Sequence, residues 1–98
     1  MTRDYELTVV LAPQLPSKKR EEVIKQVSKL VTDLKGKIEG TEEWGEKQLA
    51  YNIKNHDQGL FLHFTLSLVP SSINQVEAKL KLIPEIMRLL LVKKESQD

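Results

Sequence analysis

The stretch NHDQGLFLHFTLSLVPSSINQ, residues 55–75, is the most informative part of the chain because a turn, a strand and the start of a helix follow one another in it. Its first five residues are typical turn formers. Apolar side chains then occupy every second position from Leu60 to Leu68, which is the period of a strand with one buried face. Ser72 and Gln75 have the spacing of a capping box, which predicts that a helix begins there.

The residues that precede this stretch predict two more strands and a helix. Alternating apolar residues predict a first strand at residues 5–11, and two prolines end it. Apolar residues at helical spacing predict a helix that starts at Ser17 and continues until Gly36. Residues 37–54 predict a long second strand, kinked near Gly45, which forms a hairpin with the strand that begins at Leu60.

The residues that follow the stretch complete the fold. Pro84 is expected to end the second helix, and residues 86–93 predict a final strand. Residues 89–92 are consecutive large aliphatics, so both faces of this strand are expected to meet apolar surroundings. The order strand, helix, strand, strand, helix, strand predicts an α+β fold, namely a ferredoxin-like sandwich with a four-stranded antiparallel sheet and two helices on one face.

The length of the chain favours one domain. A chain of 98 residues is long enough for one compact core and too short for two independent ones. We therefore expect a single domain over residues 1–94, followed by a short disordered tail at residues 95–98.

The second face of the predicted sheet has no helix to cover it. If the alternating apolar side chains face the helices, the pleat places five other side chains on the uncovered face. They are Val10, Phe61, His63, Leu90 and Val92. Neighbouring apolar side chains on adjacent strands usually mark a partner, so we expect a protein contact here. The alternative is a modest uncovered strip without a partner.

The charge of the chain is mild for a protein that binds nucleic acid unaided. The net charge is +1 and the pI is about 8.0, whereas a domain pI above about 9 is usual for such proteins. Basic residues near the predicted sheet ends and the chain ends are nevertheless candidates for phosphate contacts. They are Arg3, Lys47, Lys54, Arg88, Lys93 and Lys94. Ordinary solvated charge is the alternative for any one of them.

No pattern in the sequence predicts catalysis, a cofactor or a metal site. The chain has no cysteine, His56 lies in a predicted turn, and His63 has no nucleophile or paired carboxylate at motif spacing. The phosphate-binding glycine motifs of nucleotide enzymes are absent. The longest run of large aliphatic side chains, residues 89–92, is far too short to cross a bilayer. We therefore expect a cytosolic protein that is not an enzyme, with no cofactor, no small-molecule substrate and no membrane association.

Residues 45–54, GEKQLAYNIK, carry a specific resemblance. They match without a mismatch the signature of the bacterial ribosomal small-subunit protein six family: a glycine, a basic residue two positions later, then leucine, a small residue, tyrosine and isoleucine at fixed spacing. The likeness extends over nearly the whole chain. The sequence departs from the family at Asn52, where proline is frequent, and at Trp44, which is either an added contact or a rim residue.

The resemblance implies a ferredoxin-like structural constituent of the small ribosomal subunit. Such a protein binds small-subunit ribosomal RNA as a heterodimer with the eighteenth small-subunit protein and works in translation, in the cytoplasm. A basic partner on the open sheet face would then supply the charge that this chain lacks.

Two other functions are known to occur on a ferredoxin-like fold and are alternatives to the ribosomal one. A ferredoxin-like acylphosphatase would need a glycine-rich anion loop with an arginine after the first strand, whereas residues 12–16 read APQLP. A regulatory module that binds a small molecule on the same open sheet is also compatible with the fold, because a fold alone does not determine function.

Overall fold

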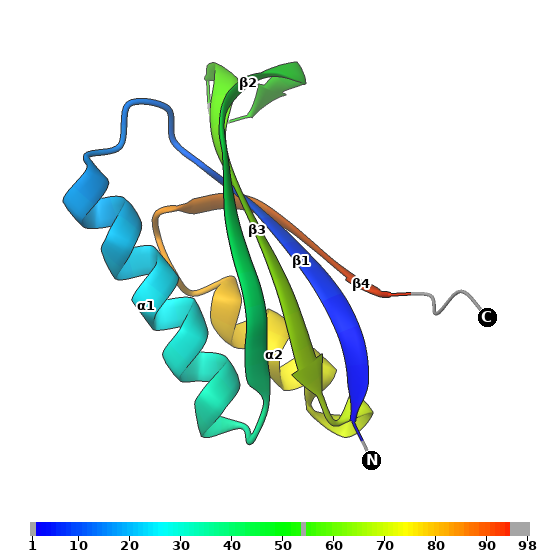
Figure 1. The fold of residues 1–98 in the computed structure, drawn as a ribbon. Coiled ribbons are helices and arrows are strands. Elements are labelled where there is room, and N and C mark those ends of the chain that lie inside the picture. The colour runs from blue at the N-terminus through cyan, green and yellow to red at the C-terminus, as the bar shows by residue number, and fades with distance from the viewer. Residues whose placement is uncertain (1, 54, 95–98) are drawn as a thin grey trace.

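The computed structural model describes residues 2–53 and 55–94 and has the predicted order of elements. The elements are β1 (Arg3–Leu11), α1 (Ser17–Asp33), β2 (Lys37–Ile53), β3 (His56–Leu68), the short 3-10 helix η1 (Pro70–Ser72), α2 (Ile73–Leu80) and β4 (Ile86–Lys93). The strands form one sheet in the order β2-β3-β1-β4, and all neighbours are antiparallel. Both helices pack on one side of this sheet (Figure 1), which confirms the ferredoxin-like α+β fold. The tail expected at residues 95–98 lies outside the described residues.

The core lies between the sheet and the helices, and the two sequence periods account for it. Side chains two positions apart on β1 and β3 share the face that meets the apolar stripes of α1 and α2. The residues that are almost completely buried are Leu7, Val9, Leu11, Val23, Val27, Val31, Leu62, Phe64, Leu66, Leu68, Val76 and Leu80. The alternate residues of the same strands necessarily point to the other face.

Two helix ends differ from the sequence expectations. The first helix ends at Asp33, and Lys35 adopts a left-handed φ of 65°. The N–H of Gly36 then donates to the carbonyl of Val31, which satisfies one of the last helical acceptors. The second helix ends at Leu80 rather than at Pro84, and Ser72 makes no side-chain capping bond because the chain enters through the 3-10 turn instead.

The β2–β3 hairpin is longer and more bent than expected. The expected turn at residues 55–59 is in fact mostly strand, because β3 already begins at His56 and Asn55 makes a tight turn with a φ of 68°. The kink near Gly45 is confirmed: Gly45 has a φ of 81°, and a bulge shifts the register between Glu43 and Gly45. Figure 1 shows that the hairpin end beyond this bulge bends out of line with the rest of the sheet.

Candidate interaction face on the open side of the sheet

The face opposite the helices, called the open face below, can be assigned from the strand register. Residues that pair with one another across antiparallel strands point to the same side. On this face, β1 and β4 are joined by the pairs Glu6–Val92, Thr8–Leu90 and Val10–Arg88. The pairs between β1 and β3 are Glu6–Thr65, Thr8–His63 and Val10–Phe61, and Glu42 on β2 pairs with His63. The five residues predicted for a protein contact therefore all lie on the open face.

These five residues differ in how much of them water can reach. Leu90 is 61% exposed and Val92 is 43% exposed, whereas Phe61 is half-buried and Val10 is buried. Val10 packs closely against Gly59, where an added Cβ atom would lie 2.4 Å from Cγ1 of Val10. The apolar surface that remains in water is therefore concentrated on β4. One face of that strand is uncovered in the chain by itself, so the expectation that both faces meet apolar surroundings stays a prediction about a partner.

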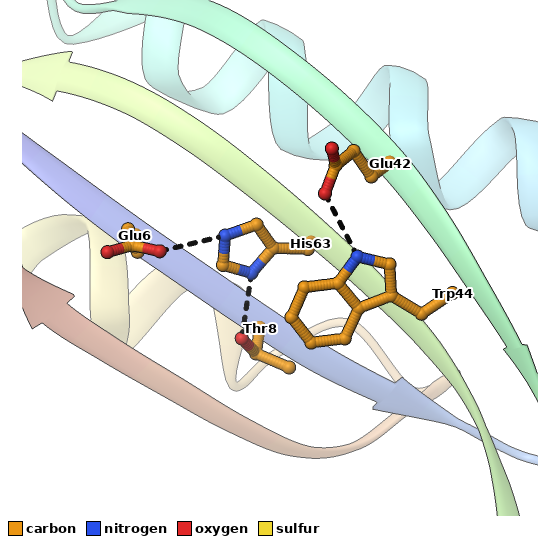
Figure 2. A network of polar contacts seen from close by, with 5 residues as sticks. All are labelled: Glu6, Thr8, Glu42, Trp44 and His63. Carbon is orange, nitrogen blue, oxygen red and sulfur yellow. Dashed lines mark hydrogen bonds and ion pairs between the residues drawn. The ribbon is translucent and has the colours of Figure 1, made fainter. Parts of the chain in front are cut away.

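His63, the fifth predicted residue, is buried and belongs to a polar network. Its Nε2 lies 3.1 Å from Oε1 of Glu6, and its Nδ1 lies 3.0 Å from Oγ1 of Thr8. Figure 2 shows that both partners come from β1, on the strand next to His63. A carboxylate can only accept, so Nε2 carries a hydrogen and donates to Glu6, and in the neutral ring the Thr8 hydroxyl donates to Nδ1. Both ring nitrogens are thus satisfied without water.

Trp44 explains why His63 is buried. Its indole stacks on the imidazole with the ring centroids 4.5 Å apart and an angle of 10° between the planes. Nε1 of Trp44 donates to Oε1 of Glu42 at 3.0 Å, and Nζ of Lys47 lies 5.2 Å from the indole centroid, within the range of a cation–π contact. Trp44 is therefore a structural part of the open face, although 41% of it remains exposed.

A second aromatic–cation pair lies at the bent end of the hairpin. The guanidinium carbon of Arg88, on β4, lies 5.1 Å from the ring centroid of Tyr51, on β2. These strands are the two outer strands of the sheet, so the contact is possible only because the hairpin end bends across the open face. Leu49, two residues before Tyr51, comes close to Gly59 in the same region.

The basic residues predicted to contact phosphate do not form one cluster. Arg3 begins β1, Lys93 is the last residue of β4 and Lys94 follows it, so these three lie at one end of the sheet. Lys47 and Arg88 lie toward the other end, each over an aromatic ring. Lys54 lies outside the described residues. The fold thus separates the described candidates into two groups.

Sequence reasoning missed several residues of the open face. The alternation along β1 already implied that Glu6 and Thr8 share a face with Val10, so their position could have been predicted. The stacking of Trp44 could not, because it depends on the bulge before Gly45, which changes the register by one residue. The contact between Tyr51 and Arg88 depends on the bend of the hairpin, for which a single sequence contains no signal.

The described residues contain few features of catalytic chemistry. Within residues 2–53 and 55–94, no group of three or more histidine, cysteine, aspartate or glutamate side chains is placed to hold a metal ion. No helix in that part of the chain is both long and apolar enough to cross a membrane. A pocket of about 310 Å³ beside β4 is lined by Lys81, Ile86, Met87, Arg88 and Leu89, none of which is a carboxylate or a histidine.

Fold and face together define the class of the protein: a ferredoxin-like α+β domain with one open sheet face that carries apolar and aromatic side chains. Its structure is similar to that of 30S ribosomal protein S6 from Thermotoga maritima, with a TM-score of 0.87 and 27% sequence identity over 96% of this chain and 89% of that one. The C-terminal domain of the MgtC protein from Mycobacterium tuberculosis has a TM-score of 0.65 at 17% identity, and this likeness concerns the fold alone.

Sequence comparison gives the family. The family described as Ribosomal protein S6 matches residues 4–93. Small ribosomal subunit protein bS6 of Fusobacterium nucleatum is 33% identical over 93 residues, which are 95% of this chain and 99% of that protein. The chain therefore belongs to the ribosomal protein S6 family, as its resemblance at residues 45–54 predicted. This is a family of structural proteins of the small ribosomal subunit and not of enzymes, and its members are located in the ribosome, in the cytoplasm.

Proposed function

We propose that the chain is a structural constituent of the small ribosomal subunit that binds small-subunit ribosomal RNA together with the eighteenth small-subunit protein. Membership of the family supports the ribosomal part of this function. The shared binding with a protein partner is supported by the open face, where Leu90 and Val92 keep large apolar side chains in water next to the Trp44–His63 stack.

The exposed pair Leu90 and Val92 is the observation that carries the proposal. Both side chains lie on one strand and on one face, two residues apart, so they form a continuous apolar strip rather than scattered contacts. Covering large aliphatic side chains contributes about 1.5–3 kcal/mol for each one that becomes fully buried. A partner that packs on the strip therefore gains affinity from residues that contribute little to the core of the free protein.

Charge gives a reason why RNA binding and partner binding would be joint. The net charge of +1 offers little counterion release for a chain that contacts RNA alone. The described basic candidates also lie in two separate groups, Arg3, Lys93 and Lys94 at one end and Lys47 and Arg88 at the other. A basic partner between them would extend the positive surface, and each protein would raise the RNA affinity of the other.

The test is a filter-binding titration of small-subunit ribosomal RNA with this chain, in the presence and absence of the eighteenth small-subunit protein. We expect the partner to raise the RNA affinity, and Leu90→Asp to remove that increase because a buried carboxylate would face the partner's apolar surface. Leu82→Asp is the matched control, since Leu82 is also exposed but lies in the segment between α2 and β4. An RNA affinity that is the same with and without the partner would refute the proposal.

The alternative of a small-molecule module on the same face is separated by calorimetry. Titration of the chain with amino acids and nucleotides should give no heat if the ribosomal function is correct. Saturable heat from one of these compounds, lost in Leu90→Asp and kept in Leu82→Asp, would favour the alternative.

A further inference from the structure

The carboxylate of Glu6 lies beside the exposed apolar side chains of the open face. Glu6, on β1, pairs in register with Val92 on one side and with Thr65 on the other. Leu90 pairs with Thr8, the next residue of β1 on the same face. The side chain of Glu6 is 39% exposed, so it is neither buried in the core nor free in solvent. Any partner that covers Leu90 and Val92 will also cover Glu6.

The position of this carboxylate is fixed by neighbouring side chains of the open face. Oε1 of Glu6 accepts from Nε2 of His63, and His63 is itself held by Thr8 and by the stacked indole of Trp44. Figure 2 shows the carboxylate at one end of this row and Trp44 at the other, with the imidazole between them. A carboxylate has about four acceptor positions, and the imidazole occupies one. The others remain for a group that approaches from the solvent side.

The charge of Glu6 has little compensation from the chain itself. Within residues 2–53 and 55–94, His63 is the one basic group within ion-pair distance of Glu6, and it need not be charged. Lys47 and Arg88, which also belong to the open face, lie over the rings of Trp44 and Tyr51. Covering an uncompensated carboxylate with apolar atoms costs several kcal/mol, which would offset most of what the neighbouring aliphatic side chains contribute.

We propose that the partner on the open face places a cationic side chain, arginine or lysine, on the carboxylate of Glu6 while its apolar side chains cover Leu90 and Val92. This inference rests on the proposed function and adds to it the chemistry that the partner must have. The apolar strip supplies affinity, and Glu6 sets the register and orientation of the partner, because a charge-assisted bond is satisfied in one arrangement only. A partner that covers Glu6 with apolar side chains alone, without a cation, would bind more weakly.

The experiment is calorimetric titration of the full chain with the purified eighteenth small-subunit protein, at low and at high salt, for the wild type and Glu6→Gln. Glutamine keeps an acceptor for Nε2 of His63, so the free protein should remain folded, which a thermal melt checks. We expect Glu6→Gln to weaken binding by about ten- to a hundredfold at low salt, the lower part of the range for charge pairs covered in an interface. The difference should shrink at high salt.

Two variants make the result specific. Glu77→Gln is the matched control, because the side chain of Glu77 is 42% exposed and its ion pair with Lys81 lies at the end of α2, on the other side of the sheet. It should bind as the wild type does. Leu90→Asp should abolish binding whether or not Glu6 meets a cation, and it therefore reports on the face alone.

The sign of the Glu6→Gln effect decides the matter. Binding that is unchanged or tighter in Glu6→Gln, with Leu90→Asp inactive, overturns the inference and leaves the proposed function intact, because an uncharged amide is then easier to cover. Loss that is equal at both salt concentrations also overturns it, since an ion pair with the partner must weaken as salt screens it. A wild type that does not bind the partner overturns both proposals.

Discussion

Replacing Trp44 by alanine should destabilise the protein, because the indole covers His63 and part of the sheet. Trp44 is 41% exposed, so more than half of it is covered. A fully covered aromatic side chain buries about 150–250 Å², and about 120 Å² at about 25 cal/mol/Å² corresponds to about 3 kcal/mol. A compact unfolded chain reduces this figure by as much as about 40%. We expect a loss of about 2 kcal/mol in the free energy of unfolding.

The assay is urea unfolding followed by circular dichroism, with Trp44→Phe as the control. Phenylalanine keeps a ring over the imidazole and loses only the exposed bond to Glu42, so it should cost less than half as much as alanine. For a domain of this size, a loss of about 2 kcal/mol lowers the melting temperature by about 10 °C. The ring proton resonances of His63 in a proton NMR spectrum should move in Trp44→Ala and remain shifted in Trp44→Phe. An alanine variant within about 0.5 kcal/mol of the wild type would refute the role given to the stack.

Two further predictions concern the sheet and the chain ends. Gly59→Ala should lower the free energy of unfolding, measured by urea titration, by about 1–3 kcal/mol. The new Cβ would lie 2.4 Å from Cγ1 of Val10, whose branched side chain has little room to move. A variant as stable as the wild type would contradict this packing. Lys93→Ala should lower the slope of log affinity for small-subunit ribosomal RNA against log salt by about one unit if Lys93 contacts a phosphate, whereas an unchanged slope would remove it from the candidates.

The fold could be predicted from sequence because each element has a strong period of its own. Apolar residues at every second position, as at Leu62, Phe64 and Leu66, and at helical spacing, as at Val23 and Val27, leave little choice of which faces meet. The same alternation placed Leu90 and Val92 on the open face, where the structure has them. Both predictions depend only on local backbone geometry, which is why they succeeded.

Exposure and contacts on the open face could not be predicted from the same pattern. The alternation of side chains along a strand assigns each residue to a face of the sheet, but it does not predict which other side chains cover that residue. Val10 and His63 were expected in an exposed strip, yet the closeness of Gly59 and the stacking of Trp44 bury them. The stacking of Trp44 depends on the bulge before Gly45, and the position of Gly59 depends on the β2–β3 pairing that continues beyond Leu60. Neither feature of the pairing can be read from the alternation of apolar residues.

The contact between Tyr51 and Arg88 has a consequence for the direction from which a partner can reach the sheet. It joins the two outer strands above the middle ones and so closes the open face at the hairpin end. The opposite end, where β1 begins and β4 finishes (Figure 1), has no such contact across it among the described residues. A partner is therefore expected to reach the face from this end, where Lys94 lies two residues beyond Val92 and its N–H donates to the carbonyl of Asp4.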